Sequence, residues 1–223
     1  MWKSFKIALK GNRWKWYFEG LQTTLTISIG AILVGCVIGI IVALIKYTNK
    51  KYGKLKIARR ICDIYITIFR GTPVYVQMLL MWLVILVSLS DMWIAILTFG
   101  INSGAYVAEI IRGGLESIDD GQLEAGSSLG LSKLQVLWHI VLPQAIRRAL
   151  PPFCNEFIAL IKETSIIGTI GVMDLTKVAD NIIGRTREPF APYIIVAVMY
   201  LVVVLILTFL LRLLEKKLSR SDK

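Results

Sequence analysis

Residues 194–211 read IIVAVMYLVVVLILTFLL and contain no charged side chain. A helix of roughly 20 such residues is long enough to cross the ~30 Å hydrocarbon core of a bilayer. In lipid, only helices and closed barrels satisfy their backbone hydrogen bonds. The strands of a barrel alternate apolar and polar residues, whereas this segment is apolar on every face. It therefore predicts a membrane-spanning α-helix.

The rest of the chain has the same character. Of its 223 residues, 56% are hydrophobic, and the mean hydropathy is +0.66. Soluble domains are usually only about 45–50% apolar. We expect an all-α integral membrane protein, folded as one domain over residues 1–223. About five spans are predicted, near residues 21–45, 61–89, 92–111, 150–161 and 193–211.

The N-terminal segment mixes aromatic and basic side chains. Residues 1–19 contain three tryptophans and five lysines or arginines. Aromatic rings and cations together are typical of the membrane–water interface. We expect residues 1–19 to form an amphipathic helix that lies on the membrane surface. The glycines Gly30, Gly35 and Gly39 in the first span should allow a neighbouring helix to pack closely.

The basic residues indicate how the chain crosses the membrane. The net charge is +11, and residues 46–60 hold seven Lys or Arg and no acid. Cytoplasmic loops carry an excess of Lys and Arg. With the N-terminus outside and the C-terminus inside, the inner segments hold 16 basic residues and the outer segments nine. The five basic residues before the first span weaken this assignment.

Other function classes find little support. The positive charge lies between apolar runs and not on a soluble domain, so nucleic-acid binding is not expected. The three cysteines have no paired spacing, and the single His139 has no neighbouring ligand residues, so neither a disulfide framework nor a metal site is predicted. Without a Ser/His or Cys/His constellation, a membrane-embedded enzyme is also disfavoured.

The second span is interrupted by the sequence Arg70-Gly71-Thr72-Pro73. Proline cannot donate to the helical ladder, and it disfavours helical geometry at the residue before it. We therefore predict two half-helices separated by a break near mid-membrane. A simple kink, or two short spans joined by a tight turn, is the alternative.

The polar stretch 119–143 reads DDGQLEAGSSLGLSKLQVLWHIVLP. Asp119 or Asp120 can cap a first short helix and Gly130 can end it. Ser132 and Gln135 form a capping box for a second helix, and Pro143 should limit that helix and start the next element. The stretch is thus expected to fold into a compact pair of short cytoplasmic helices.

This stretch resembles the E-A-A-x-x-x-G-x(9)-I-x-L-P loop of bacterial ABC importer permeases. The matching residues here are Glu124, Ala125, Gly126, Gly130, Ile140, Leu142 and Pro143. The one departure is Gly126, where the family commonly has alanine, and we expect this change to be tolerated. The resemblance implies that these residues form coupling helices, which dock into a groove on a separate cytoplasmic ATPase subunit.

The resemblance extends over nearly the whole chain and points to the polar amino-acid subfamily. Its further motifs here are 19–25, 69–73 with Gln77, 103–114, 143–148 and 160–165. Permeases for histidine, arginine and glutamine carry this set. The resemblance implies a bacterial inner-membrane protein with four kinds of protein or ligand partner. These are a dimer of ATPase subunits, a second permease copy (homodimer or heterodimer), an extracytoplasmic solute-binding protein and a polar amino acid.

No G-x-x-x-x-G-K-[ST] motif occurs in the sequence, so this chain is not expected to bind or hydrolyse ATP or to need a cofactor. Energy should arrive from the partner ATPase through 119–143, and bulk at Gly130 should uncouple ATP hydrolysis from transport. A secondary transporter or channel acting alone would not need such a docking feature, and this chain is small and without repeats for one.

A zwitterionic substrate requires one site for its carboxylate and one for its amine. The break at Gly71 and Thr72 offers free backbone N–H groups and a hydroxyl for the carboxylate. Glu163 and Glu109 are candidates for the amine, with Asn102 as a polar helper, because ionisable residues inside a membrane are usually functional.

Structural roles for these acids remain open. Glu109 can pair with Arg112, Glu163 can pair with Lys162 or cap a helix end through Thr164, and Asp63 and Arg70 can satisfy each other. A basic substrate such as arginine, histidine or lysine is our first prediction. Glutamine or another polar amino acid is the alternative, since glutamine-type relatives also carry an acid at the Glu163 position.

Residues 174–183 place five apolar side chains on one helical face. On the outside of the membrane this helix would gate the pore, meet the binding protein, or simply lie on the surface.

Overall fold

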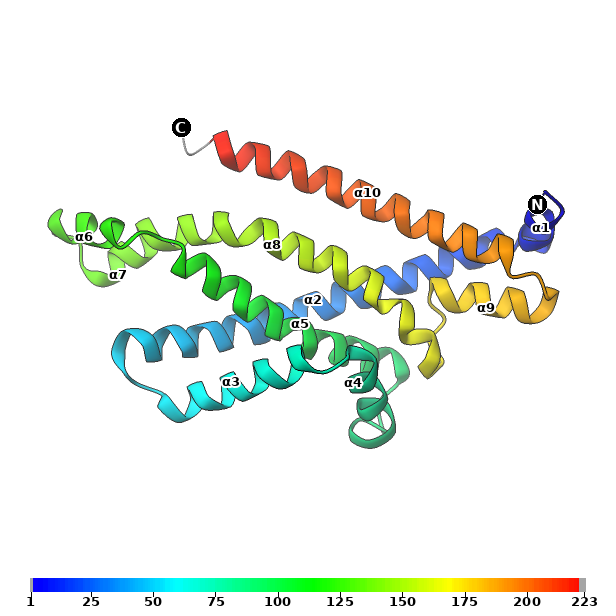
Figure 1. The fold of residues 1–223 in the computed structure, drawn as a ribbon, viewed down its shortest axis with the longest axis horizontal. Helices are drawn as coiled ribbons and strands as arrows, with labels where there is room; N and C mark the ends of the chain where they lie inside the picture. The colour runs from blue at the N-terminus through cyan, green and yellow to red at the C-terminus, as the bar shows by residue number, and fades with distance from the viewer. Residues whose placement is uncertain (1, 221–223) are drawn as a thin grey trace.

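The computed structural model describes residues 2–220 and is helical through almost all of that range, with no strand in it. Figure 1 shows an elongated bundle in which the long helices run along a common axis, while α1 and α4 lie across it. The helices are α1 (Trp2–Leu9), α2 (Arg13–Tyr52), α3 (Lys56–Gly71), α4 (Val74–Leu80), α5 (Asp91–Glu116), α6 (Asp120–Ser128), α7 (Lys133–Val136), α8 (Leu142–Glu163), α9 (Leu175–Thr186) and α10 (Phe190–Arg220).

The central contact of the bundle is between α2 and α5, and glycines make it possible. A Cβ placed on Gly100 would lie 2.7 Å from Val34 Cβ, and one on Gly39 would lie 2.6 Å from Val107 Cγ1. Both distances are far below a normal van der Waals contact, so the two backbones approach as closely as glycine allows. This confirms the close packing predicted from the glycines of the first span.

The described residues contain three helices that are long and apolar enough to cross a membrane, or four if the bent pair α3–α4 counts as one span. The prediction of about five spans is therefore supported only in part. The remaining candidate, α8, has 22 residues, but Arg147, Arg148 and Glu156 lie within it and lower its apolar character. Helix α8 is long enough to span a membrane, but it is not apolar enough to be recognised as a span by composition.

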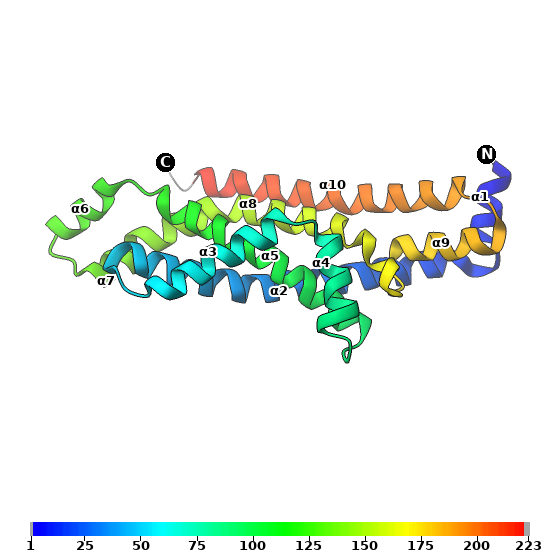
Figure 2. The same cartoon turned by 60° about the horizontal axis from the view of Figure 1, so that its bottom comes forward.

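The predicted single surface helix over residues 1–19 is wrong. The chain turns at Gly11 (φ +69°) and Asn12 (φ +62°), and the long helix α2 begins at Arg13. Two consecutive residues in the left-handed region end one helix and start another. Figures 1 and 2 show α1 crossing the end of the bundle, while residues 13–19 extend the first span.

Several helices are longer than the predicted spans. Helix α5 continues to Glu116 and α10 begins at Phe190 and continues to Arg220, beyond the predicted ends at 111 and 211. Hydropathy marks the apolar part of a helix, but the backbone ladder continues into the polar region where charged side chains face water.

Helix α9 confirms the amphipathic helix predicted near 174–183. Its residues Leu175, Val178 and Ile182 are buried against Tyr17 of α2 and Val196 of α10. Asp174 caps it by accepting from the backbone N–H groups of Thr176 and Lys177. Burial raises the pKa of the Asp174 carboxyl above its usual range, although these hydrogen bonds act in the opposite direction.

The two ends of the bundle differ. Helices α1 and α9 lie at one end. Helices α6 and α7 lie at the opposite end, where α6 projects past the ends of the long helices (Figures 1 and 2). The end of α2 and the start of α3, which carry the basic block 46–60, lie on the side of α6 and α7 (Figure 1).

Candidate functional site

The second span is broken where the sequence predicts it. Helix α3 ends at Gly71 and α4 begins at Val74, and the two helices meet at an angle of 108°. Thr72 and Pro73 between them are extended, with ψ of 148° and 131°. This confirms the break and excludes a simple kink, because the chain leaves helical geometry for two residues.

Two amide side chains form hydrogen bonds to the backbone carbonyls at the break. Gln77 Nε2 donates to the carbonyl oxygens of Phe69 and Thr72, at 3.0 Å each, and to Thr72 Oγ1 at 2.8 Å. From α5, Asn102 Nδ2 donates to the same Phe69 carbonyl and to Gln77 Oε1, at 2.9 Å each. Both amides are buried. They satisfy carbonyls that lose their helical partners where α3 ends.

These hydrogen bonds occupy polar groups of two candidate substrate-binding residues, Thr72 and Asn102. The hydroxyl of Thr72 donates to the Ile68 carbonyl and accepts from Gln77, and the amide nitrogen of Asn102 is occupied by two acceptors. Gly71 is exposed, and nothing lies within 4 Å of the position of a Cβ on it. Open space therefore remains at Gly71 and on the exposed side of Thr72.

Glu109 is the centre of an ion-pair cluster. Its carboxylate lies 2.7 Å from Arg112 Nη2, 3.2 Å from Lys46 Nζ and 3.8 Å from Arg70 Nη1. The pair with Arg112 confirms the structural alternative for Glu109. The predicted pairing of Asp63 with Arg70 is wrong, because Asp63 lies 2.9 Å from Lys46 Nζ, which the α2–α3 turn brings next to it.

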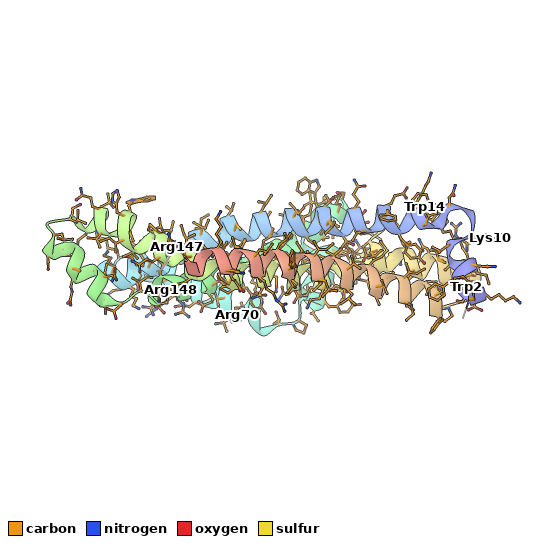
Figure 3. All side chains as sticks on the ribbon, turned by 90° about the horizontal axis from the view of Figure 1, so that it is seen from above. Trp2, Lys10, Trp14, Arg70, Arg147 and Arg148 are labelled. Carbon is orange, nitrogen blue, oxygen red and sulfur yellow. The ribbon has the colours of Figure 1, made fainter. Side chains whose placement is uncertain are left out.

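Arg70 lies near the break and faces α5. Its guanidinium carbon is 5.1 Å from the centre of the Tyr106 ring, a distance typical of a cation–π contact. Figure 3 shows Arg70 between Arg147 and Arg148 on one side and Lys10 on the other, so it lies well inside the length of the bundle. The guanidinium thus contacts both Tyr106 and, at 3.8 Å, the Glu109 carboxylate of the same helix.

Sequence analysis missed Glu156. It lies in α8, half-buried, and Ser103 Oγ of α5 donates to its Oε1 at 2.9 Å. The available signal was an acid in the apolar run 150–161, which is the same argument that selected Glu109 and Glu163. Ser103 follows Asn102, so α5 contacts both the break and α8 through consecutive residues.

Glu163 is the last residue of α8 and is exposed. Within residues 2–220, no hydrogen bond or ion pair of its carboxylate is found. Thr164 Oγ1 donates to the Ile161 carbonyl, so the alternative of a cap through Thr164 is wrong. Of the predicted site residues, Thr72 and Asn102 are brought together through Gln77, Glu109 joins the break through Arg70, and Glu163 is joined to none of them.

The segment 119–143 folds largely as predicted. Asp119 caps α6 by accepting from Gly121 N at 2.7 Å, and Ser132 and Gln135 form the capping box of α7. Gly130 has a φ of +78°, which explains the glycine at this turn. Glu124 and Ala125 are exposed, and Gly126 is buried.

One expectation for this segment holds in part: Pro143 lies in the first turn of the next helix, α8, but it does not separate α7 from it. Helix α7 does not end at Pro143 but runs through a π-helical turn, Leu137–Val141, into α8, which starts at Leu142. The wide turn lies directly before Pro143, the residue that cannot donate to the ladder, so the helix continues without a break. Leu142 is half-buried and Pro143 is exposed.

The tip of this segment exposes apolar side chains. Leu129, Leu134 and Trp138 are 80%, 66% and 60% exposed. Large exposed apolar side chains that lie together are typical of surfaces that bind a protein partner or a membrane.

Comparison with known proteins identifies the family. Residues 23–220 match the family described as binding-protein-dependent transport system inner membrane component. The chain belongs to this family. It is a permease component of the inner membrane and a non-catalytic subunit. Systems of this family combine such permeases with an ATPase and a binding protein.

Curated relatives cover nearly the whole chain. A putative glutamine transport system permease protein GlnP of Rickettsia bellii is 38% identical over 207 residues, which are 91% of this chain and 93% of that protein. The glutamine transport system permease protein GlnP of Escherichia coli K12 is 38% identical over 206 residues, 90% and 92% of the two chains.

Solved structures share the fold. One described as an amino acid ABC transporter with histidines matches with a TM-score of 0.83 at 37% identity, covering 91% of this chain and 94% of that one. The MetNI methionine ABC transporter in an inward-facing conformation matches with a TM-score of 0.75 at 18% identity, over 91% and 96% of the chains. At that identity the match to MetNI concerns the fold alone.

Proposed function

We propose that this chain forms the translocation path of an ATP-driven importer for a polar amino acid, with glutamine as the first candidate. The observation that carries the proposal is the similarity to permeases named for glutamine, at 38% identity over nine-tenths of the chain. The sequence alone favours a basic substrate. The relatives and the solved amino acid transporter support the broader class of polar amino acids better.

A neutral zwitterion such as glutamine needs one cation and one acid, whereas a basic amino acid needs a second acid. Arg70 at the break, together with Gly71 and the exposed side of Thr72, offers a site for the carboxylate. Glu163 has a free carboxylate for the amine. Asn102 and Glu109 are weaker candidates for direct contact, because their side chains are held by Gln77 and by three cations.

The proposed arrangement in the membrane has five spans: α2, the bent pair α3–α4, α5, α8 and α10. Helix α8 has 22 residues and is about 33 Å long, and it packs against both α5 and α10. The charge asymmetry of the loops supports an outer N-terminus and an inner C-terminus. Segment 119–143 then lies in the cytoplasm, where the ATPase dimer would dock on Glu124, Ala125, Gly126 and Gly130.

In the proposed mechanism, closure of the ATPase dimer moves α6 and α7. Because α7 continues into α8 without a break, that motion passes along one helix to Glu156 and Glu163. A second copy of the permease completes the pore, and a solute-binding protein delivers the substrate to the outer end.

The test is to purify the permease with its ATPase in lipid, add the binding protein and measure ATPase stimulation with each of the twenty amino acids. Stimulation by glutamine supports the proposal, and stimulation by arginine, histidine or lysine alone replaces glutamine with a basic substrate. No stimulation by any amino acid would overturn the amino-acid assignment. Glu163→Gln should weaken transport of the preferred substrate, while Glu19→Gln, which removes another exposed acid, should not.

A further inference from the structure

The N-terminal helix α1 has three distinct faces. Ser4 and Ala8 are buried against the bundle. A second face carries Trp2, Phe5 and Leu9, of which Trp2 and Leu9 are 77% and 42% exposed. The third face, beside the second, carries the exposed Lys3 and Lys6, and the exposed Lys10 follows directly after α1 at the same helical spacing.

The orientation of this helix is held by specific contacts. Arg13 Nη1 donates to the Ile7 carbonyl at 2.7 Å and so satisfies the end of α1 across the turn at Gly11. Phe5 packs edge-on against Phe190 of α10, with ring centres 6.4 Å apart. Figures 1 and 2 agree that α1 runs across the axis of the spans, and therefore parallel to the plane of a membrane that the spans cross.

Within the described residues, the lysines of this face have no acidic partner. None of the ion pairs found in residues 2–220 involves them, and Glu19 is the one acid in residues 1–19. The other two cations of this segment are engaged, Arg13 with Ile7 and Lys15 over the Trp14 ring. Three unpaired cations in one row next to a tryptophan therefore face the region outside the bundle.

We propose that this face of α1, Lys3, Lys6 and Lys10 with Trp2, is a binding surface for anionic phospholipids. A helix parallel to the membrane plane places its apolar side chains among acyl chains and its lysines among headgroups. Figure 3 shows Lys10 and Trp2 together at one end of the molecule, with Trp14 nearer the middle. Basic and aromatic side chains gather in this way at a membrane interface. Anionic headgroups supply the charge complementarity that the protein lacks here.

Lipid binding at this surface does not depend on which amino acid the protein transports. It also explains why a basic segment precedes the first span on the side where the loop charges predict few cations. Binding to anionic lipid would fix the outer end of α2 and α10 through α1, since α1 contacts both helices.

The experiment uses the complete transporter in vesicles of 80% phosphatidylcholine and 20% phosphatidylglycerol, with bromine on the acyl chains of one lipid at a time. Bromine quenches tryptophan fluorescence on contact, and subtracting the Trp2→Phe variant isolates the signal of Trp2. We expect brominated phosphatidylglycerol to quench Trp2 far more than its share of the lipid predicts. Removing each lysine should lower this preference by roughly fivefold.

The variant K3Q/K6Q/K10Q should lose the preference, and the matched variant K3R/K6R/K10R should keep it, because both alter the same exposed positions and only one removes charge. High salt should weaken the preference in the wild type, as screening requires. Quenching of wild-type Trp2 in proportion to lipid composition, or an unchanged preference in the glutamine variant, would overturn the proposal. ATPase stimulation by substrate in neutral vesicles is measured separately and tests only the proposed function.

Discussion

Asn102 of α5 and Gln77 of α4 form a buried amide pair, with Asn102 Nδ2 donating to Gln77 Oε1 at 2.9 Å. Each amide also donates to the carbonyl of Phe69, near the end of α3. Three helices thus meet at one backbone oxygen. The break in the second span is a fixed structural feature, because the polar groups it exposes are satisfied inside the protein.

The first prediction concerns this pair. Gln77→Leu removes a donor from the Thr72 and Phe69 carbonyls and the acceptor of the buried Asn102 amide. It should destabilise the protein by about 1–3 kcal/mol, measured as a lower Tm of the detergent-solubilised transporter. Gln22→Leu replaces an exposed glutamine in α2 and should change the Tm little. The double variant with Asn102→Leu should lose less than the sum of the single variants, since the two residues share partners. Strict additivity would contradict the coupling described here.

The second prediction concerns the contact of α2 and α5. Gly100→Ala places a methyl group 2.7 Å from Val34 Cβ and should cost about 1–3 kcal/mol through overpacking. Gly113→Ala in the same helix meets nothing within 4 Å and should be neutral or stabilise the helix by up to about 1 kcal/mol. Thermal unfolding of both variants checks this difference, and equal Tm values would show that the helices can separate at no cost.

The third prediction concerns coupling. Gly130→Trp should leave the ATPase bound but uncouple ATP hydrolysis from transport, because it adds bulk at the exposed turn between α6 and α7. Gly53→Trp is the control, since Gly53 also has a positive φ of +65° and open space around it, but it lies in the turn after α2. The two substitutions therefore introduce similar backbone strain. Measurements of ATPase activity and uptake in proteoliposomes distinguish the two, and normal uptake by Gly130→Trp would contradict the assigned role.

The fourth prediction concerns the ion pairs around Glu109. Lys46 is 18% exposed and contacts both Asp63 and Glu109, whereas Lys50 is 70% exposed and contacts Glu116. Lys46→Met should destabilise the protein by about 3 kcal/mol, because it leaves a half-buried acid with less compensation. Lys50→Met should cost less than about 1 kcal/mol. A similar loss of Tm in both variants would mean that solvent screens both pairs equally.

Sequence reasoning located the elements whose causes are local. The break at Thr72 and Pro73, the capping box of Ser132 and Gln135, and the turn at Gly130 all depend on the chemistry of neighbouring residues, and each was predicted. It failed where the cause was distant. The single surface helix over 1–19 was wrong because residues 13–19 continue α2, with Tyr17 buried against α9 and α10, and Asp63 pairs with Lys46 because a turn brings α3 back along α2.

Consecutive residues are enough to identify this chain as a helical membrane protein of the binding-protein-dependent permease family, because hydropathy and the motif at 124–143 are properties of neighbouring residues. Which polar side chains have hydrogen-bond or ion-pair partners depends on the packing of the helices. Asn102, Thr72 and Glu109 are held by partners from other helices, Glu156 is joined to Ser103 across α5 and α8, and Glu163 has no such partner in residues 2–220. Hydrogen bonds and ion pairs depend on distances between atoms, and only the packing of helices sets those distances.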